Sequence, residues 1–444
     1  MSKNTVETKR DGFLNTTPIL QYILVTLLFP LWGAAASLND VLIAQFKTIF
    51  DLSNFASAFV QSAFYGGYFI FALPAALLVK KTSYRLTIVT GLLMYIIGCS
   101  LFFPASHMAT YGMFLIALFI IAIGLSCLET SANTYALLLG RKDKATQRIN
   151  LSQTFYPIGA MAGAILGKYF IFTEGDSLEK QMSVMNSKEA TQFGLEMLQR
   201  TMTPYIILII ILVIVMILFM LIKFPKCKPA EVEKSSDNTV DFKEGLYHLS
   251  KNKGFIKGVL TQFIYMGLQT TVWSFTLRLA LDVNPHINER FATNFVIFSF
   301  VAFFIGRFIA TSLLSKFDAN KILMVYSAIG VIVLLYASLI PNISAVYAAV
   351  FVSVLFGPCW PTIYGKTIEK INNPKYIEFG GAILIMSIIG GAVMPALQGL
   401  VADIFGSMQL SFIVPMFCFL YIAMYFYGER KRNIESKKVK VLQS

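Results

Sequence analysis

Long apolar runs recur along the whole chain, each bounded by charged or turn-forming residues. A helix of roughly 20 apolar residues crosses the hydrocarbon core of a bilayer, which is about 30 Å thick. Twelve runs meet this requirement, near residues 18–46, 55–79, 86–104, 111–139, 149–172, 204–224, 255–280, 290–315, 322–340, 344–367, 380–403 and 407–428. The pattern predicts an all-α membrane protein with twelve transmembrane helices.

The polar stretches between these runs divide the chain into two similar halves. The expected parts are a tail (1–17), a six-helix bundle (18–224), a charged linker (225–254), a second six-helix bundle (255–428) and a second tail (429–444). Small residues recur at the same spacing in corresponding spans, at Gly159 and Gly167 in the fifth and at Gly391 and Gly399 in the eleventh. Small residues let helices approach closely in lipid. A duplicated architecture is common in transporters, which bind substrate between the two halves.

Composition agrees with the pattern, since 56% of the 444 residues are hydrophobic and only 14% are charged. A soluble protein of this size is usually about 25% charged. The net charge of +13 would fit a nucleic-acid partner, but the distribution of the charge excludes one. Of the 37 Lys and Arg residues, 30 fall on the side of the termini and seven on the opposite side. This asymmetry predicts that both termini and the linker lie in the cytoplasm.

The N-terminus and the cysteines set further bounds. The first apolar run follows a polar segment without a small-residue cleavage site, so we expect a retained span rather than a cleaved signal. The five cysteines are scattered, with no CxxC and no His/Cys cluster, and therefore indicate neither a disulfide framework nor a metal site. No cofactor is expected. Residues 173–200 are expected to form the one long outer loop, with a short surface helix.

Asp40 lies in the apolar stretch "LWGAAASLNDVLIAQF", more than twenty residues into the first span. An ionisable side chain inside a membrane is costly and usually marks a pathway or a site. Helical spacing places Trp32, Ala36, Asn39 and Asp40 on one narrow face. The alternative is that Asp40 only marks the watery outer end of this span.

Glu129 lies deeper in its span than Asp40 does, within the apolar stretch "FLIALFIIAIGLSCLETSANTYALLLG". Ser126, Glu129, Thr130 and Asn133 follow the spacing i, i+3, i+4, i+7, which places four polar side chains on one helix face. Such a face is expected to point at protein or water rather than lipid. The alternative is a purely structural, hydrogen-bonded glutamate.

Neutral amide and aromatic side chains form stripes in several other spans. Amides donate and accept hydrogen bonds as sugar hydroxyls do, and aromatic rings pack against the apolar face of a sugar. A single Tyr or Trp is more often an interfacial anchor. The combination nevertheless predicts a site for a neutral polyol, with candidate substrate-binding residues Trp32, Asn39, Gln61, Tyr65, Asn133, Gln153, Tyr156, Gln262, Gln269, Trp273, Asn294 and Trp360.

The positions of the cations and histidines narrow the coupling chemistry. Arg278 and Lys168 lie near span ends, where snorkelling to the interface is the usual explanation. All three histidines lie in loops. If protons drive transport, the carrier must be a carboxyl group, because burial lets a carboxyl group hold a proton at neutral pH. Asp40 and Glu129 are the candidates.

Several motifs together carry a resemblance that runs in order from about residue 20 to 428. The stretches "LNDVLIAQF", "QSAFYGGYFIFALPAALLVKKTSY", "GLSCLETSAN", "INLSQTF", "GLQTTVWSF" and "FFIGRF" resemble the bacterial fucose–proton symporter family (fucose, galactose and glucose–hexose symporters) of the major facilitator superfamily. The resemblance implies twelve helices, alternating access and monosaccharide uptake coupled to a proton in the bacterial cytoplasmic membrane. By the same resemblance, the proton-coupling acids are Asp40 and Glu129.

Departures from the family pattern and rival functions leave the substrate open. This chain has Ala36-Ser37 and Tyr156 where fucose symporters carry amides, and Trp360 where they carry Tyr. These departures favour a different hexose or an amino-sugar over fucose itself. A sodium-coupled or uncoupled sugar carrier remains an alternative. A membrane enzyme acting on lipid-linked sugars and a nutrient sensor are disfavoured, because the outer loops lack catalytic clusters and the tail is short. We expect a functional monomer without enzymatic activity.

Overall fold

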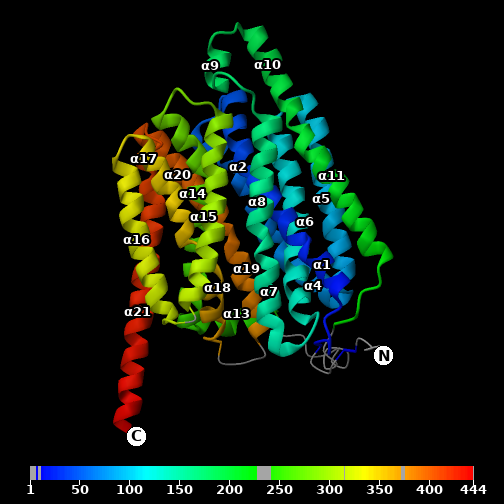
Figure 1. The fold of residues 1–444 in the computed structure, drawn as a ribbon, viewed down its shortest axis with the longest axis vertical. Coiled ribbons are helices and arrows are strands. Elements are labelled where there is room, and N and C mark those ends of the chain that lie inside the picture. Colours follow the sequence, from blue (N-terminus) through cyan, green and yellow to red (C-terminus); the bar gives the residue numbers. More distant parts are fainter. Residues whose placement is uncertain (1–6, 9–11, 228–241, 315, 372–375, 444) are drawn as a thin grey trace. The chain divides into compact units, whose positions relative to one another are not determined.

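The computed structural model describes residues 7–8, 12–227, 242–314, 316–371 and 376–443 (Figure 1). Helices account for nearly all of them, and the β-structure in these ranges is one isolated bridge between Thr8 and Leu14. Ten helices within the described ranges are long and apolar enough to cross a membrane. The predicted all-α fold class is therefore confirmed.

The two remaining predicted spans are helical as well, but each departs from a plain apolar helix. The span at 149–172 is divided into α7 (Ala145–Gln153), α8 (Phe155–Leu166) and a π-helical turn (Gly167–Ile171). The span at 255–280 lies within α14 (Lys253–Val283). Glutamine, threonine and arginine side chains along α14 lower its hydropathy, which fits a helix that faces protein rather than lipid.

The chain forms two compact units. The N unit contains Met1–Asn39, Ala63–Thr173 and Met182–Tyr247, and the C unit contains Asp40–Ser62, Glu174–Gln181 and His248–Ser444. The change of unit at 247/248 falls within the expected linker. Two short segments, 40–62 and 174–181, pack with the C unit although both of their neighbours along the chain belong to the N unit.

The helices of the N unit pack through small residues. α5 lies along both α6 and α11, as Figure 1 also shows. Where α5 meets α6, a Cβ added at Gly91 would lie 2.8 Å from the backbone oxygen of Gly124, so only glycine allows this approach. The bounds are α1 (Ile19–Thr26), α2 (Leu28–Ile49), α4 (Phe59–Lys81), α5 (Tyr84–Met108), α6 (Tyr111–Leu138), α10 (Ser187–Arg200) and α11 (Met202–Leu221).

The repeated glycines of the fifth span mark a second close contact in this unit. A Cβ at Gly159 would lie 1.9 Å from the backbone oxygen of Pro30, and one at Gly163 would lie 2.5 Å from that of Ala34. α8 therefore packs directly on the first half of α2, which carries the stripe ending at Asn39.

In the C unit α14 is central, because it contacts α15, α17, α18, α20 and α21. Small residues allow these close approaches: a Cβ at Gly390, the first residue of α20, would lie 1.9 Å from the backbone oxygen of Phe263 on α14. The bounds are α3 (Asn54–Ser57), α13 (Phe242–Lys251), α15 (Glu289–Leu314), α16 (Ala319–Leu339), α17 (Ile343–Leu355), α18 (Cys359–Ile368), α19 (Ile377–Met386), α20 (Gly390–Phe405) and α21 (Ile413–Gln443).

Residues 173–200, expected as an outer loop with a short helix, contain α9 (Leu178–Ser183) and α10. A capping box starts α10, since the Asn186 side chain accepts from the Glu189 backbone N–H and Glu189 accepts from that of Asn186. The segment 174–181 is fastened within the C unit: the Leu178 N–H donates to both carboxylate oxygens of Glu289, at 3.0 and 3.1 Å.

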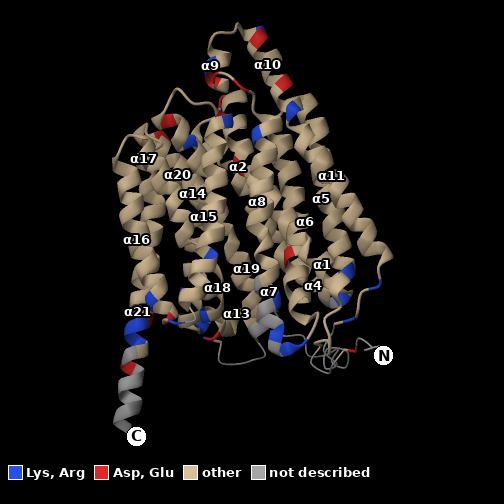
Figure 2. Cartoon of the chain, in the orientation of Figure 1, with Lys and Arg blue, Asp and Glu red and all other residues tan. Residues whose placement is uncertain are grey.

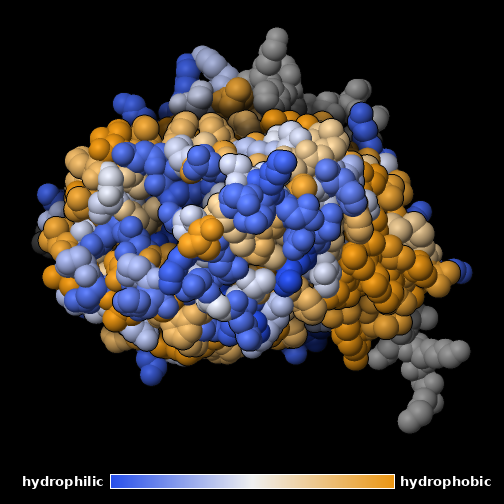
Figure 3. Space-filling view, turned by 90° about the horizontal axis from the view of Figure 1, so that it is seen from above, coloured by the Kyte–Doolittle hydropathy of each residue, from blue (hydrophilic) through white to orange (hydrophobic). Residues whose placement is uncertain are grey.

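The surface of the helices separates apolar flanks from charged ends. In each unit the middle of the helices carries few charged residues, which gather at the helix ends (Figure 2). Along α11, one exposed apolar stripe runs through Ile210, Ile214, Ile217 and Leu221. Viewed end-on, hydrophilic side chains cover much of the visible face and hydrophobic ones lie on the flank (Figure 3). Apolar flanks of this kind suit contact with lipid tails.

Candidate functional site

Asp40 is the centre of a buried polar cluster in the C unit. Only 8% of the residue is exposed. Its Oδ1 accepts a hydrogen bond from Gln61 Nε2 at 2.6 Å and another from Ser274 Oγ at 2.6 Å. Gln61 Nε2 also donates to Ser274 Oγ at 2.7 Å. Burial in this network does not fit the alternative that Asp40 marks the watery end of its span.

Local structure brings these side chains together from three helices. Ser53 caps α3 by accepting from the Ala56 N–H, and this short helix turns the chain from α2 into α4. On α20, the Asp403 carboxylate accepts from the N–H groups of Asn54 and Phe55 at 3.0 and 2.8 Å. The first turn of α4, with Gln61, is thereby held against α2, while Ser274 comes from the middle of α14.

Arg278 lies one helical turn beyond Ser274 and is 5% exposed. Its Nη1 donates to Ser57 Oγ at 2.9 Å, and its guanidinium carbon lies 3.7 Å from the ring centroid of Phe275. The guanidinium also interacts electrostatically with the Asp40 carboxylate. The prediction that Arg278 snorkels to the interface is therefore wrong. Asp40, Ser57, Gln61, Ser274 and Arg278 are called the Asp40 cluster below.

Glu129 lies in the N unit and is half-buried. Tyr68 of α4 donates a hydrogen bond to its carboxyl group. Ser126, one turn earlier on α6, donates to the Tyr68 backbone oxygen at 3.4 Å. One turn later, the Asn133 Oδ1 accepts from Gln153 Nε2 at 3.0 Å. Tyr68, Ser126, Glu129, Asn133 and Gln153 are called the Glu129 cluster below.

Other N-unit candidates lie on the neighbouring helices. Trp32 is 4% exposed and packs on Phe29, with ring centroids 4.4 Å apart. Asn39 is fully buried. The Tyr65 ring lies 6.3 Å from that of Tyr68, between centroids, and is half-buried. Tyr156 is also half-buried, on the helix that approaches α2 at Gly33.

The C-unit candidates have contrasting surroundings. The indole N–H of Trp273 donates to Ser353 Oγ at 3.1 Å, and its ring packs among Phe300, Phe303 and Phe356. Trp360 is half-buried and stacks on Tyr364, with centroids 5.3 Å apart. These contacts give Trp273 a place in the aromatic core of the unit and leave part of the Trp360 stack accessible. Two further amides, Asn294 and Gln269, are half-buried and buried respectively.

Gln262 is a fully buried amide on α14. Neither its Nε2 nor its Oε1 has a hydrogen-bond partner among the described residues. An unpaired buried polar group costs about 1–3 kcal/mol, so such an amide favours a polar ligand as its partner. Sequence reasoning selected Gln262 for its residue type, and the structure adds that no group in the described part of the chain pairs with its amide.

Several residues of the Asp40 cluster were missed at the level of sequence. Gln61 was expected to contact substrate, whereas its amide binds Asp40. Ser57 and Ser274 drew no attention, because serine is common in membrane helices and its bonds here cross more than 200 residues of sequence. The signal that was available is Arg278, a cation four residues after Ser274 on one face of α14.

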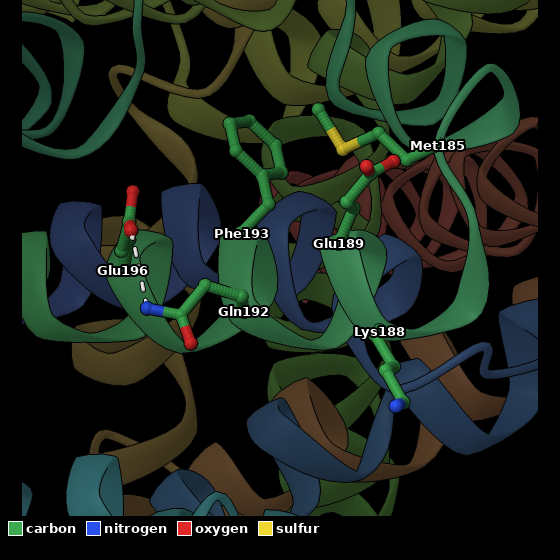
Figure 4. Close-up of a pocket in the computed structure, with 6 residues that line it drawn as sticks. All are labelled: Met185, Lys188, Glu189, Gln192, Phe193 and Glu196. Atoms are coloured by element: carbon green, nitrogen blue, oxygen red, sulfur yellow. Dashed lines mark hydrogen bonds between the residues drawn. The ribbon is translucent and has the colours of Figure 1, made fainter.

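A cavity of about 550 Å³ lies along α10, lined by Met185, Lys188, Glu189, Gln192, Phe193 and Glu196 (Figure 4). None of the candidate site residues lines it. In the part of the chain that the structure describes, no three His, Cys, Asp or Glu side chains gather in a group that could hold a metal ion.

Comparison with known proteins gives consistent matches over almost the full chain. Residues 19–377 match the family model described as Major Facilitator Superfamily. The L-fucose-proton symporter of Escherichia coli (strain K12) is 35% identical over 426 residues, covering 94% of each chain. The glucose/galactose transporter of Brucella abortus biovar 1 is 31% identical over 422 residues, covering 95% of each.

A solved structure supports the same assignment. A crystal structure of the E. coli fucose:proton symporter matches with a TM-score of 0.69 and 33% sequence identity, covering 92% of this chain and 98% of that one. Together with the ten candidate spans, this match supports the predicted twelve-helix architecture.

Proposed function

The chain belongs to the Major Facilitator Superfamily, and from this premise we propose that it imports a neutral monosaccharide together with a proton by alternating access. The observation that carries the proposal is the Asp40 cluster, in a chain whose relatives include an L-fucose-proton symporter. A membrane-buried carboxyl group held by neutral donors is suited to bind and release a proton during transport.

The substrate class follows from the neutral character of the remaining candidates. The two named relatives are an L-fucose-proton symporter and a glucose/galactose transporter, so both are named for hexoses or deoxyhexoses. Gln262 supports a polar ligand because its amide is unmatched, and the Trp360–Tyr364 stack supports packing against a sugar ring. The departures at Ala36, Ser37 and Tyr156 favour a hexose or amino-sugar other than fucose.

The coupling ion is proposed to be a proton, carried by Asp40 and Glu129. Carboxylates also bind sodium, so a sodium-coupled carrier and an uncoupled carrier are the competing outcomes. Both termini are proposed to lie in the cytoplasm, because 30 of the 37 basic residues fall on their side. The protein is proposed to work as a monomer in the bacterial inner membrane, without enzymatic activity.

Reconstitution in liposomes tests the proposal. Labelled fucose, glucose, galactose and an amino-sugar are offered with an inward proton gradient, with an inward sodium gradient and with neither. Accumulation of one sugar above equilibrium with the proton gradient alone is expected. Accumulation that follows the sodium gradient, or mere equilibration under all conditions, would overturn proton symport while leaving sugar transport standing.

A further inference from the structure

The hydrogen bonds of the Asp40 cluster have a fixed direction. An amide nitrogen can only donate, so Gln61 Nε2 donates both to Asp40 and to Ser274 Oγ. The Ser274 hydroxyl therefore accepts from Gln61 and sends its own proton to Asp40 Oδ1. Ser274 of α14 thus links Gln61 of α4 to Asp40 of α2 through two short hydrogen bonds.

This arrangement suits an ionised carboxylate. A carboxylate accepts hydrogen bonds and donates none, and bonds to an ionised acceptor are roughly twice as strong as neutral ones. Two donors at 2.6 Å converge on one oxygen, and the buried guanidinium of Arg278 lies one turn along the same helix. When α14 packs against α2 and α4, the cluster stabilises the deprotonated acid.

Each of the packed elements carries charged groups besides Asp40. In the segment 40–62 these are Lys47 and Asp51, on α14 they are Lys253, Lys257, Arg278 and Asp282, and on α20 the charged group is Asp403. Asp403 is occupied by the N–H groups of Asn54 and Phe55. Of these groups, Arg278 is the one that interacts electrostatically with Asp40.

We infer that Ser274 is a positioning residue for ion coupling, which ties proton release from Asp40 to the packing of α14 against α2 and α4. This inference rests on the proposed proton symport and adds a residue through which helix packing acts on the acid. When α14 is packed, its hydroxyl and guanidinium favour release of the proton. When α14 withdraws, both leave with the helix, and Asp40 retains the proton.

The test is the pH dependence of sugar exchange in liposomes, with the same pH on both sides so that no gradient drives transport. Ser274→Ala removes one donor to the carboxylate, which then forms less readily. The pH midpoint of exchange is expected to move upward by about one pH unit. One hydrogen bond to a charged group contributes about 1.5 kcal/mol, and about 1.4 kcal/mol corresponds to one pH unit. The apparent KM for sugar at low pH is expected to stay within about twofold.

Matched variants separate positioning from packing. Ser274→Thr keeps the hydroxyl and should keep the wild-type midpoint, whereas Ser274→Cys keeps the size with a weak donor and should shift it. Ser299→Ala makes the same chemical change at a buried serine that donates only to its own helix, at Phe295 O, and should not move the midpoint.

Each outcome bears on a different claim. If active Ser274→Ala and Ser274→Cys both keep the wild-type midpoint, the positioning role is overturned and proton symport stands. If Ser299→Ala moves the midpoint as far, the effect is general packing and the inference is likewise overturned. The accumulation experiment with a proton gradient tests the coupling itself. If the wild-type protein does not accumulate sugar in response to that gradient, the proposed coupling is overturned, and this inference with it.

Discussion

The two membrane acids differ in what surrounds them. The Asp40 cluster is buried and gathers donors from two helices, α4 and α14, with a buried arginine one turn beyond Ser274. In the Glu129 cluster Glu129, Asn133 and Gln153 are half-buried, the acid accepts a hydrogen bond from Tyr68, and the cluster contains no cation. Glu129 is thus partly accessible, whereas the contacts of Asp40 depend on how helices pack. The difference suggests separate tasks, with Asp40 serving the ion and Glu129 the sugar as well.

Asp40→Asn is expected to give the largest effect, loss of gradient-driven accumulation. An amide keeps the shape of the side chain but cannot cycle a proton. With one proton per sugar, a gradient of one pH unit supports about tenfold accumulation, and this factor should vanish while exchange continues. Uptake of labelled sugar into liposomes measures it. Full accumulation by Asp40→Asn would end the assignment of this acid as the proton carrier.

Arg278→Gln is expected to give the next largest effect, on stability. The variant removes a buried guanidinium that donates to Ser57 and acts electrostatically on Asp40, and losing a hydrogen bond from a charged group costs about 1.5–3 kcal/mol. Thermal unfolding of the purified protein in detergent should show a lower Tm. Arg278→Lys, which keeps the charge, should lose less. The double variant Asp40→Asn/Arg278→Gln should recover part of the loss, and additive losses would mean that the two groups are not coupled.

Glu129→Gln is expected to act on sugar binding more than on stability. A ligand hydrogen bond to a carboxylate is worth about 1.5 kcal/mol or more, so the apparent KM should rise about tenfold or further. Initial rates of uptake against sugar concentration measure this change. The matched control is Glu196→Gln on α10, at an exposed position outside the cluster. Unchanged sugar binding and transport in Glu129→Gln would identify Glu129 as a structural residue.

Tyr68→Phe should give the smallest effect, because it removes one hydrogen bond from Glu129 and leaves the ring in place. A net contribution of about 1 kcal/mol predicts a change of about fivefold in apparent KM. Tyr336→Phe is the control, since this exposed tyrosine of α16 pairs through its hydroxyl with Ser344 of α17. An effect of Tyr68→Phe as large as that of Glu129→Gln would mean that the tyrosine itself contacts the sugar.

The sequence allowed the spans to be predicted and both acids to be located within them, because hydropathy and helical spacing are local properties. The face at Ser126, Glu129 and Asn133 follows from one helix alone. The Asp40 cluster does not, since Gln61 and Ser274 reach Asp40 across 21 and 234 residues. Pairings at such distances depend on tertiary packing, and no periodicity within one helix reports them.

The break between α7 and α8 was also beyond the sequence pattern. Residues 149–172 have the apolar content of one span, but the regular helix is interrupted at Thr154 and changes to π-helix at Gly167. The end of α7 instead forms hydrogen bonds with neighbouring helices: Ser152 pairs with Thr26 at 3.0 Å, and Gln153 with Asn133. Contacts with residues outside the segment 149–172 therefore determine where its helix is interrupted.

The bond from Leu178 to Glu289 also anchors a segment at which the chain passes from the N unit into the C unit. Glu174 belongs to the C unit and its neighbour Thr173 to the N unit, so no spare chain lies between them. An extended chain spans at most about 3.6 Å per residue. The segment 174–181 therefore spans about 29 Å at most when extended, and Glu289 holds it within the C unit. Glu289 thereby fastens this segment to the start of α15 within the C unit.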